Sequence, residues 1–296
     1  MVKHLFKLFL IVPLFCVICF ISGCNIDLLG LFAANDLDER LEHRNNYKFL
    51  DGKNSQGEDR NWRTTLTLGD SFQFIVLSDT HIQDGDAFGL EKLADVTKNN
   101  TEIKFVVITG DITQDAAVKD IDKFIEIADS LGVPCYPVAG NHDVYYRNDT
   151  INRDKGWPVW KEKIGSTNYR INGGGATLFI LDSANSFFGK DQLDWLEREI
   201  NTNTKNSRIF VFSHSPLFVI GPMDMQQMTD TKERARILSI LRNKCKIMFM
   251  GHLHKHMENK AGNVDYLALA SYIEDKAYYL VTVTPGGVRY ERKTLK

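Results

Sequence analysis

The stretch FQFIVLSDTH, residues 72–81, joins an apolar strand pattern to a polar end. The same arrangement recurs in FVVITGD, residues 105–111, and in CYPVAGNHD, residues 135–143. Between these segments, residues 90–98 are expected to be helical, and residues 116–131 place their apolar side chains at helical spacing. Strands that alternate with helices in this way predict an α/β sheet with parallel strand pairs.

The second half of the chain continues the pattern. Residues 209–212 form an apolar segment that ends in Ser213-His214, and residues 247–250 end in Gly251-His252-Leu253-His254. Further helices are predicted at 190–200 and 232–241, and further strands at 169–171, 177–181, 264–268, 277–284 and 287–293.

Several of the predicted strands are followed directly by polar side chains that can bind metals. These side chains are Asp79, His81, Asp111, Asn141, His142, Asp143, His214, His252 and His254. Sites in open α/β sheets gather outside the carboxyl ends of the strands, so we expect one site built from the whole domain. Carboxylate, imidazole and amide ligands suit Mn, Fe or Zn. The set is larger than one ion needs, which favours two divalent metal ions about 3.5–4 Å apart.

The order of these motifs is distinctive. It runs Asp79-Thr80-His81, Gly110-Asp111, Gly140-Asn141-His142-Asp143, His214 and Gly251-His252-Leu253-His254. This order resembles the signature of calcineurin-like metallophosphoesterases over about residues 70–256, and the spacing is most similar to their class III cyclic-nucleotide phosphodiesterase branch. The resemblance implies a four-layer α/β/β/α sandwich of two mixed sheets flanked by helices.

The resemblance also implies a role for each motif residue. One metal ion would be held by Asp79, His81, Asp111 and His254, and Asp111 would bridge to a second ion held by Asn141, His214 and His252. A hydroxide between the two ions would attack the phosphorus atom. His142 would contact the phosphate and help to protonate the leaving oxygen, as an imidazole can near neutral pH. Asp143 would support a ligand or anchor its loop.

The expected activity is therefore metal-dependent hydrolysis of a phosphoester, with diesters favoured over monoesters. The alternative is a metal-binding lipoprotein that keeps the fold without catalysis and serves binding or adhesion. All of the motif residues are present, which favours the enzyme.

The N-terminus resembles a bacterial lipoprotein signal. Lys3 and Lys7 precede an apolar run over residues 8–21, and Ile21-Ser22-Gly23-Cys24 resembles a lipobox. The resemblance implies a signal peptide at 1–23 and a diacylglyceryl group on Cys24, which would anchor the protein to a membrane of the cell envelope outside the cytoplasm. An uncleaved anchor helix and an ordinary signal peptide are the alternatives. Residues 24–65 are expected to be a tether with one helix from Asn35 to about Leu50, followed by the domain at 66–296.

Composition adds two limits. The formal net charge of −2 and the lack of a long Lys/Arg run give no electrostatic reason to expect a nucleic-acid partner. Cys135 and Cys245 both open predicted strands, so buried thiols are favoured over a disulfide, which spacing alone cannot show.

Other candidate residues have simpler interpretations. Asp84 and Asp86 are interpreted as loop residues, His256 as a solvated side chain or one at the substrate rim, and 173–175 (Gly-Gly-Gly) as a hairpin turn. The aromatic residues of the irregular region 144–168 could line a substrate pocket or belong to the core, and both interpretations stay open. These residues are Tyr145, Tyr146, Trp157 and Trp160.

Overall fold

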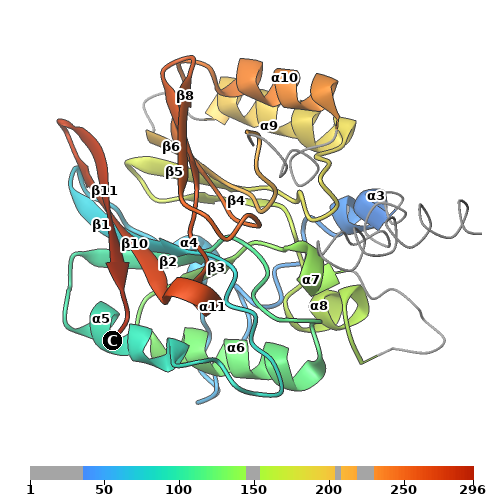
Figure 1. Ribbon diagram of the computed structural model, residues 1–296, viewed down its shortest axis with the longest axis vertical. Coiled ribbons are helices and arrows are strands. Elements are labelled where there is room, and N and C mark those ends of the chain that lie inside the picture. Colours follow the sequence, from blue (N-terminus) through green and yellow to red (C-terminus); the bar gives the residue numbers. More distant parts are fainter. Residues whose placement is uncertain (1–35, 145–153, 204–207, 219–229) are drawn as a thin grey trace, which may run out of the picture.

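The computed structural model describes residues 36–144, 154–203, 208–218 and 230–296, whose strands form two mixed sheets (Figure 1). The first sheet has the order β11-β10-β1-β2-β3 and the second has the order β4-β5-β6-β7-β9-β8. The strands of the first sheet are β1 (Phe72–Leu77), β2 (Ile103–Ile108), β3 (Cys135–Pro137), β10 (Ala277–Thr284) and β11 (Gly287–Thr294). Those of the second are β4 (Tyr169–Asn172), β5 (Ala176–Ile180), β6 (Arg208–Phe212), β7 (Cys245–Met250), β8 (Met257–Ala261) and β9 (Val264–Ala268).

Helices cover the outer faces of both sheets. Figure 1 shows α5 and α6 on the outside of the first sheet, and α9 and α10 on the outside of the second. This arrangement confirms the predicted four-layer sandwich. The helices are α3 (Asp36–Glu42), α4 (Trp62–Thr65), η1 (Leu90–Lys92), α5 (Leu93–Lys98), α6 (Val118–Ser130), α7 (Asn141–Val144), α8 (Trp157–Lys163), α9 (Lys190–Asn203), α10 (Thr231–Leu241) and α11 (Tyr272–Asp275).

The central strands are parallel and buried on both faces. β1 pairs with β2 and β2 with β3, while β5, β6, β7 and β9 form a second parallel run. Because both faces of a parallel sheet are covered, its strands contain runs of consecutive apolar residues rather than an alternation, as in FIVL, residues 74–77 of β1. The carboxyl ends of neighbouring parallel strands therefore meet at one edge, where the polar motifs follow.

Aromatic side chains fill the space between the sheets. Phe74 of β1 stacks on Phe105 of β2 with ring centroids 4.6 Å apart. Its edges meet Phe210 and Phe249 of the second sheet at 5.4 and 5.9 Å. Trp157 and Trp160 are also buried in the main hydrophobic core. Of the two interpretations, substrate pocket or core, the structure therefore supports the core for these two residues. Tyr145 and Tyr146 lie outside the described residues.

The segment before the domain differs from its prediction. Residues 36–65 were expected to belong to a tether, but they pack against the domain. Leu37, Leu41, Phe49 and Leu50 are buried, which explains the ordered packing. The first helix ends at Glu42, earlier than predicted. The predicted signal peptide and Cys24 lie outside the described residues.

The cysteine and turn predictions are confirmed. Cys135 and Cys245 are buried free thiols. Residues 173–175 connect the antiparallel strands β4 and β5. In the part of the chain that the structure describes, no helix is long and apolar enough to cross a membrane.

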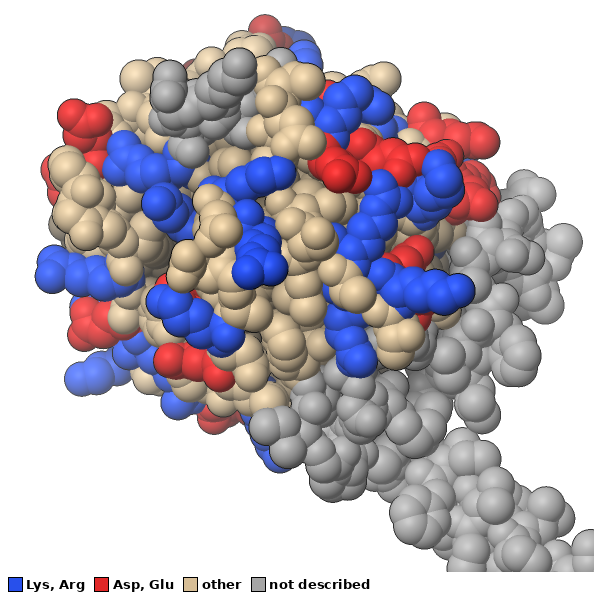
Figure 2. All heavy atoms as spheres, turned by 90° about the horizontal axis from the view of Figure 1, so that it is seen from above, with Lys and Arg blue, Asp and Glu red and all other residues tan. Residues whose placement is uncertain are grey.

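The outer surface of the α9–α10 layer carries charges of both signs. Figure 2 shows many Lys and Arg side chains on the face seen from above, with Asp and Glu among them. Several form ion pairs within this layer: Arg236 pairs with both Asp194 and Glu197 of α9 at up to 3.0 Å, and Lys190 pairs with Asp194 at 2.5 Å. Part of the positive charge is therefore neutralised locally.

Candidate metal centre

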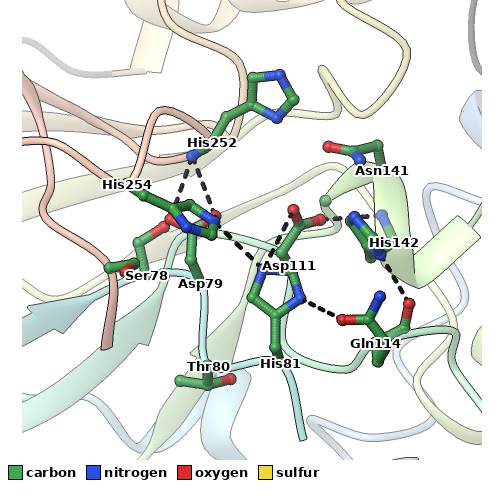
Figure 3. A network of polar contacts seen from close by, with 12 residues as sticks. Ser78, Asp79, Thr80, His81, Asp111, Gln114, Asn141, His142, His252 and His254 are labelled. Carbon is green, nitrogen blue, oxygen red and sulfur yellow. Dashed lines mark hydrogen bonds and ion pairs between the residues drawn. The ribbon is translucent and has the colours of Figure 1, made fainter. Parts of the chain in front are cut away.

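The structure brings the predicted ligands together at one edge of the sandwich (Figure 3). Their positions follow directly from the topology. Asp79 and His81 follow β1, Asp111 follows β2, Asn141 and His142 begin α7 after β3, His214 follows β6, and His252 and His254 follow β7. Ligand atoms within 4.8 Å of one another form three overlapping groups: Asp79/His81/His254, His81/Asp111/His142 and Asp111/His214/His252.

Five of these residues have left-handed backbone conformations. The φ angles are 56° for Asp79, 46° for His81, 48° for Asp111, 73° for His252 and 56° for His254. Residues other than glycine rarely adopt positive φ, which costs on the order of 1–3 kcal/mol at each position. The packed strands hold this strain, and its concentration at one edge marks a site at which the side-chain directions matter.

Two motif glycines are required by close packing around the ligands. A Cβ atom on Gly140 would lie 2.1 Å from the backbone nitrogen of Asp111. A Cβ atom on Gly251 would lie 2.0 Å from the Ser78 hydroxyl oxygen. Both glycines therefore let neighbouring strand ends approach closely enough to place ligands in one cluster.

The first cluster contains two imidazoles that point at each other. The Nε2 atoms of His81 and His254 are 3.3 Å apart, and His254 Nε2 is 3.5 Å from Asp79 Oδ1. The opposite ring nitrogens are held outside the cluster, since His81 Nδ1 donates to Gln114 Oε1 at 3.0 Å and His254 Nδ1 donates to Glu274 Oε1 at 2.7 Å. In neutral rings the two Nε2 lone pairs therefore face each other, an arrangement that a cation between them would stabilise.

The second cluster repeats this chemistry around His214. Its Nδ1 donates to the Thr109 carbonyl oxygen at 2.9 Å. Its Nε2 lies 2.9 Å from Asn141 Oδ1, 3.1 Å from His252 Nδ1 and 3.3 Å from Asp111 Oδ2. In the neutral ring, with its proton on Nδ1, three acceptor atoms would therefore surround the unprotonated Nε2. The donor set of imidazole, carboxylate and amide oxygens fits Mn, Fe or Zn.

Asp111 lies between the two clusters. The same Oδ2 atom that contacts His214 is 3.9 Å from His81 Nε2, which suits a ligand shared by two ions. Burial opposes ionisation of Asp111, but His214 and other imidazoles nearby hold its pKa well below the usual value. Burial likewise lowers the pKa of His214, yet Asp111 and Asp79 outweigh this effect and raise it to about 9. The buried carboxylates therefore stabilise a positive charge at the position of His214.

His142 lies beside the clusters and has a different environment. Its backbone N–H donates to Asp111 Oδ1 at 2.9 Å, and its Nδ1 donates to the Gln114 carbonyl oxygen at 2.7 Å. Its ring is nearly perpendicular to that of His81, with centroids 4.9 Å apart. The hydrogen bond to Gln114 fixes the ring and directs Nε2 away from that carbonyl.

Asp143 anchors the loop that carries Asn141 and His142. Its carboxylate accepts hydrogen bonds from the backbone N–H groups of Gly140, Ile112 and Thr113 at 2.9–3.1 Å. Burial, aided by the charge of Asp111, raises the pKa of Asp143 to about 6. Of the two roles that the sequence suggested, these contacts describe the loop anchor.

A cavity of about 510 Å³ opens beside the clusters. Six predicted site residues line it: His81, Asp111, Asn141, His142, His252 and His254. The remaining wall consists of Gln83, Phe88, Gln114, Leu253, Lys255, Ile273 and Glu274. A small phosphoester could therefore reach both clusters and His142 from solvent.

Three acidic or imidazole side chains near the motifs have other partners. Asp84 forms an ion pair with Lys119, and Asp86 accepts from the Phe88 backbone N–H at 2.7 Å. Both are loop residues, as predicted. His256 contacts the Tyr279 hydroxyl at 3.0 Å and Glu258 at 2.8 Å, so its ring nitrogens are used outside the clusters.

Sequence reasoning missed Gln114 and Glu274, which orient His81 and His254. Gln114 lies three residues after Asp111, and this short distance from a predicted ligand was an available signal. Glu274 lies in the short helix α11, far from every motif in the sequence, and only the fold brings it to His254.

The chain is similar to named phosphodiesterases in sequence and to a named phosphatase in fold. The chain is 29% identical over 222 residues to a probable cyclic nucleotide phosphodiesterase of Fibrobacter succinogenes, covering 70% of this chain and 78% of the relative. It is 28% identical over 199 residues to a probable glycerophosphodiester phosphodiesterase of Arcobacter nitrofigilis, covering 61% and 71%. A dimetal phosphatase from Danio rerio has a similar fold, with a TM-score of 0.53, 15% identity, and coverage of 76% of this chain and 99% of the other.

The sequence model of one family covers most of the sandwich. The calcineurin-like phosphoesterase model matches residues 72–256, from the start of β1 to just beyond His254. All of the residues in the two clusters lie inside this range. The chain belongs to the calcineurin-like phosphoesterase family.

Proposed function

We propose that this protein hydrolyses a phosphodiester in a reaction that depends on two divalent metal ions. The observation that carries the proposal is the pair of clusters in which ring nitrogens and carboxylate oxygens face one another around Asp111. Such clusters of acceptors need cations, and they line a cavity large enough for a small substrate.

The two clusters assign ligands to the ions. Asp79, His81 and His254 would hold one ion, Asn141, His214 and His252 would hold the other, and Asp111 would contact both. When bound, such ions neutralise charge on the phosphoryl oxygens and make water a stronger nucleophile at neutral pH. Gln114, Glu274 and Thr109 keep the outer ring nitrogens protonated, so that the inner nitrogens stay available as ligands.

His142 is proposed to supply the proton that the leaving oxygen needs. Its Nδ1–H is committed to the Gln114 carbonyl oxygen, which fixes the ring at the cavity wall. In the protonated ring, Nε2–H would donate to the ester oxygen as the P–O bond breaks, and the proton would leave with the alcohol. His142 would then recover its proton from water.

The relatives support a diester substrate. One is named a cyclic nucleotide phosphodiesterase and another a glycerophosphodiester phosphodiesterase, and both names describe phosphodiesters. The cavity wall beside the clusters includes the apolar side chains of Phe88, Leu253 and Ile273, which could contact an ester group.

We also propose that Cys24 carries the lipid that anchors the protein to a membrane outside the cytoplasm. The support is the lipobox Ile21-Ser22-Gly23-Cys24 after a short apolar run.

Hydrolysis of two synthetic esters tests the proposed activity. The purified protein would be assayed on bis-p-nitrophenyl phosphate and p-nitrophenyl phosphate, with added Mn²⁺ and after chelation. We expect metal-dependent release of nitrophenol, faster from the diester. If neither ester is hydrolysed at any metal concentration, the protein is better described as a metal-binding lipoprotein without catalysis. A faster reaction on the monoester would instead reverse the substrate preference.

A further inference from the structure

The helix α3 precedes the matched family region and packs against the domain. Figure 1 shows it next to α7 and α8. Glu39 of α3 accepts a hydrogen bond from Trp157 Nε1 of α8 at 3.1 Å. The side chains of Leu37 and Leu41 lie beside Gly189, in the loop before α9. This helix therefore touches α8 on one side and the loop before α9 on the other.

Arg40 is the buried charge of this helix. Its guanidinium binds the Asp182 carboxylate with two hydrogen bonds, 2.7 and 3.0 Å long, and its Nη2 also donates to Asn185 Oδ1 at 2.6 Å. The side chains of Arg40 and Asp182 are 1% and 0% exposed. A buried, bidentate pair of this kind fixes geometry strongly, because neither charge can turn to water. Arg40 thereby holds both ends of the loop 182–185.

The residue after Asp182 is in direct contact with the metal centre. The Ser183 hydroxyl oxygen accepts the backbone N–H of His214 at 3.0 Å and that of Ser215 at 2.9 Å. The Ser215 hydroxyl in turn donates to the Ser183 carbonyl oxygen at 2.7 Å. The position of the His214 backbone therefore depends on the loop that Arg40 holds.

We infer that Arg40 is a positioning residue for the metal-binding cluster around His214. The path runs from Arg40 through the Asp182 carboxylate to the adjacent Ser183 and on to the His214 backbone. The helix before the family domain is then part of the functional unit. The inference rests on the proposed function, since it assumes that His214 binds a metal ion.

A second buried pair in the same N-terminal region provides a matched control. Arg60 binds Asp129 of α6 with two hydrogen bonds, 2.7 and 3.1 Å long, and the two side chains are 5% and 2% exposed. Among the described residues, the two side chains also form hydrogen bonds with the Phe49 carbonyl oxygen and the Ser55 backbone N–H, and neither residue is a predicted ligand. Loss of Arg60 should therefore reduce stability without changing the metal centre.

Mn²⁺ titration of chelated, full-length protein separates the two roles. Wild type, Arg40→Met, Arg60→Met and Ser183→Ala would be compared by calorimetry and by the electron paramagnetic resonance signal of bound Mn²⁺, with thermal unfolding recorded for each. We expect Arg40→Met and Ser183→Ala to weaken one of the Mn²⁺ sites by about 10-fold or more, as is typical when groups that orient ligands are removed. Arg60→Met should lower the melting temperature but bind Mn²⁺ as wild type does.

Each other outcome overturns a distinct claim. Unchanged Mn²⁺ affinity in Arg40→Met, or an equal loss of Mn²⁺ affinity in Arg60→Met, would show that Arg40 has only a structural role. If Arg40→Met does not fold, Ser183→Ala decides, and unchanged affinity in that variant would refute the path to His214. If the wild type itself binds no Mn²⁺, Fe²⁺ or Zn²⁺, the proposed function fails and this inference fails with it. Binding of metal without hydrolysis would reject the activity alone.

Discussion

His142 is the predicted site residue whose role depends most on its exact environment. Its ring is fixed by the Gln114 carbonyl oxygen at 2.7 Å, and a ring nitrogen of His142 lies within 4.8 Å of the ligand atoms of His81 and Asp111. Replacement by alanine removes the proposed proton donor, and general acid catalysis typically contributes about 10²–10⁴-fold. We expect His142→Ala to lose turnover of the diester by about this factor and to keep its Mn²⁺ affinity within a few-fold.

Steady-state kinetics with a matched variant tests this prediction. His256→Ala removes another imidazole, on an exposed residue, whose partners, Tyr279 and Glu258, lie outside the clusters. This control should retain the wild-type rate. Full activity of His142→Ala would refute its assigned role.

The histidines of the clusters also predict how metal binding depends on pH. Burial works against protonation of His214 and His254, but Asp111 and Asp79 respectively raise both pKa values to about 9. In the unfolded chain, a histidine side chain has a pKa of about 6.5. In metal-free protein these protons therefore stabilise the fold fully below about pH 6.5, and the stabilisation is lost as the pH rises toward 9.

Metal ions require the unprotonated nitrogens, so protons compete with them. We expect Mn²⁺ affinity to rise between about pH 6.5 and 9, and Mn²⁺ binding near pH 7.5 to release protons. Calorimetric titration in buffers of different ionisation enthalpy measures this release directly. Proton uptake, or an affinity independent of pH in this range, would show that metal binding does not displace protons from these two histidines.

The residues of the site were predictable to different degrees. Asp79, Asp111 and His214 could be predicted because each follows an apolar strand run directly, and parallel strands bring their carboxyl ends together. Glu274 could not be predicted in this way, because its contact with His254 joins two segments through the tertiary fold alone.

At the scale of secondary-structure elements, the predictions were good where the hydrophobic pattern was strong. The strand β1 has the predicted bounds, because five of its six residues are apolar and polar residues flank it on both sides. The strand β8 was missed. Its sequence MENKA is partly exposed and lies at the edge of the sheet, where polar residues replace the apolar signal. The short helices α7 and α8 fall in a region without a continuous period.

The turn after β3 gives a prediction at this scale. A Cβ atom at position 140 would overlap the backbone of Asp111 at 2.1 Å, and backbone atoms cannot turn away as a flexible side chain can. We expect Gly140→Ala to destabilise the protein by about 1–3 kcal/mol and to reduce metal affinity. Gly286→Ala is the control, because its nearest neighbour, Thr284 Oγ1, would be 3.6 Å away.

Chemical denaturation and Mn²⁺ titration of both glycine variants check this expectation. The control should change stability by no more than about 0.5 kcal/mol. Equal behaviour of the two variants would mean that the strand ends are not as tightly packed as described.

At the scale of the whole molecule, the four-layer sandwich could be predicted from the alternation of strands and helices and from the family resemblance. The position of residues 36–65 could not. Charged and polar residues dominate this segment, so its composition indicated a tether. Its few apolar side chains and the buried Arg40 find complementary partners only on the folded domain, and local composition does not report such partners.

The proposed membrane anchor also concerns the whole molecule. If Cys24 carries a diacylglyceryl group, Cys24→Ser should move the protein from the membrane fraction to the aqueous fraction, since stable anchoring depends on buried acyl chains. Fractionation with mass spectrometry of the mature N-terminus measures this. An unmodified wild-type N-terminus, or a retained Met1, would contradict the lipoprotein proposal.

The recovery of hydrolysis on adding metal back tests the central claim most directly. Chelated wild type and Asp111→Asn would be titrated with Mn²⁺ while hydrolysis of bis-p-nitrophenyl phosphate is followed. Because Asp111 lies between the two clusters, we predict saturable recovery for the wild type and a rate lower by orders of magnitude for the variant. Full activity of the chelated wild type, or equal recovery of Asp111→Asn, would contradict a phosphodiesterase that works through a metal pair shared by Asp111.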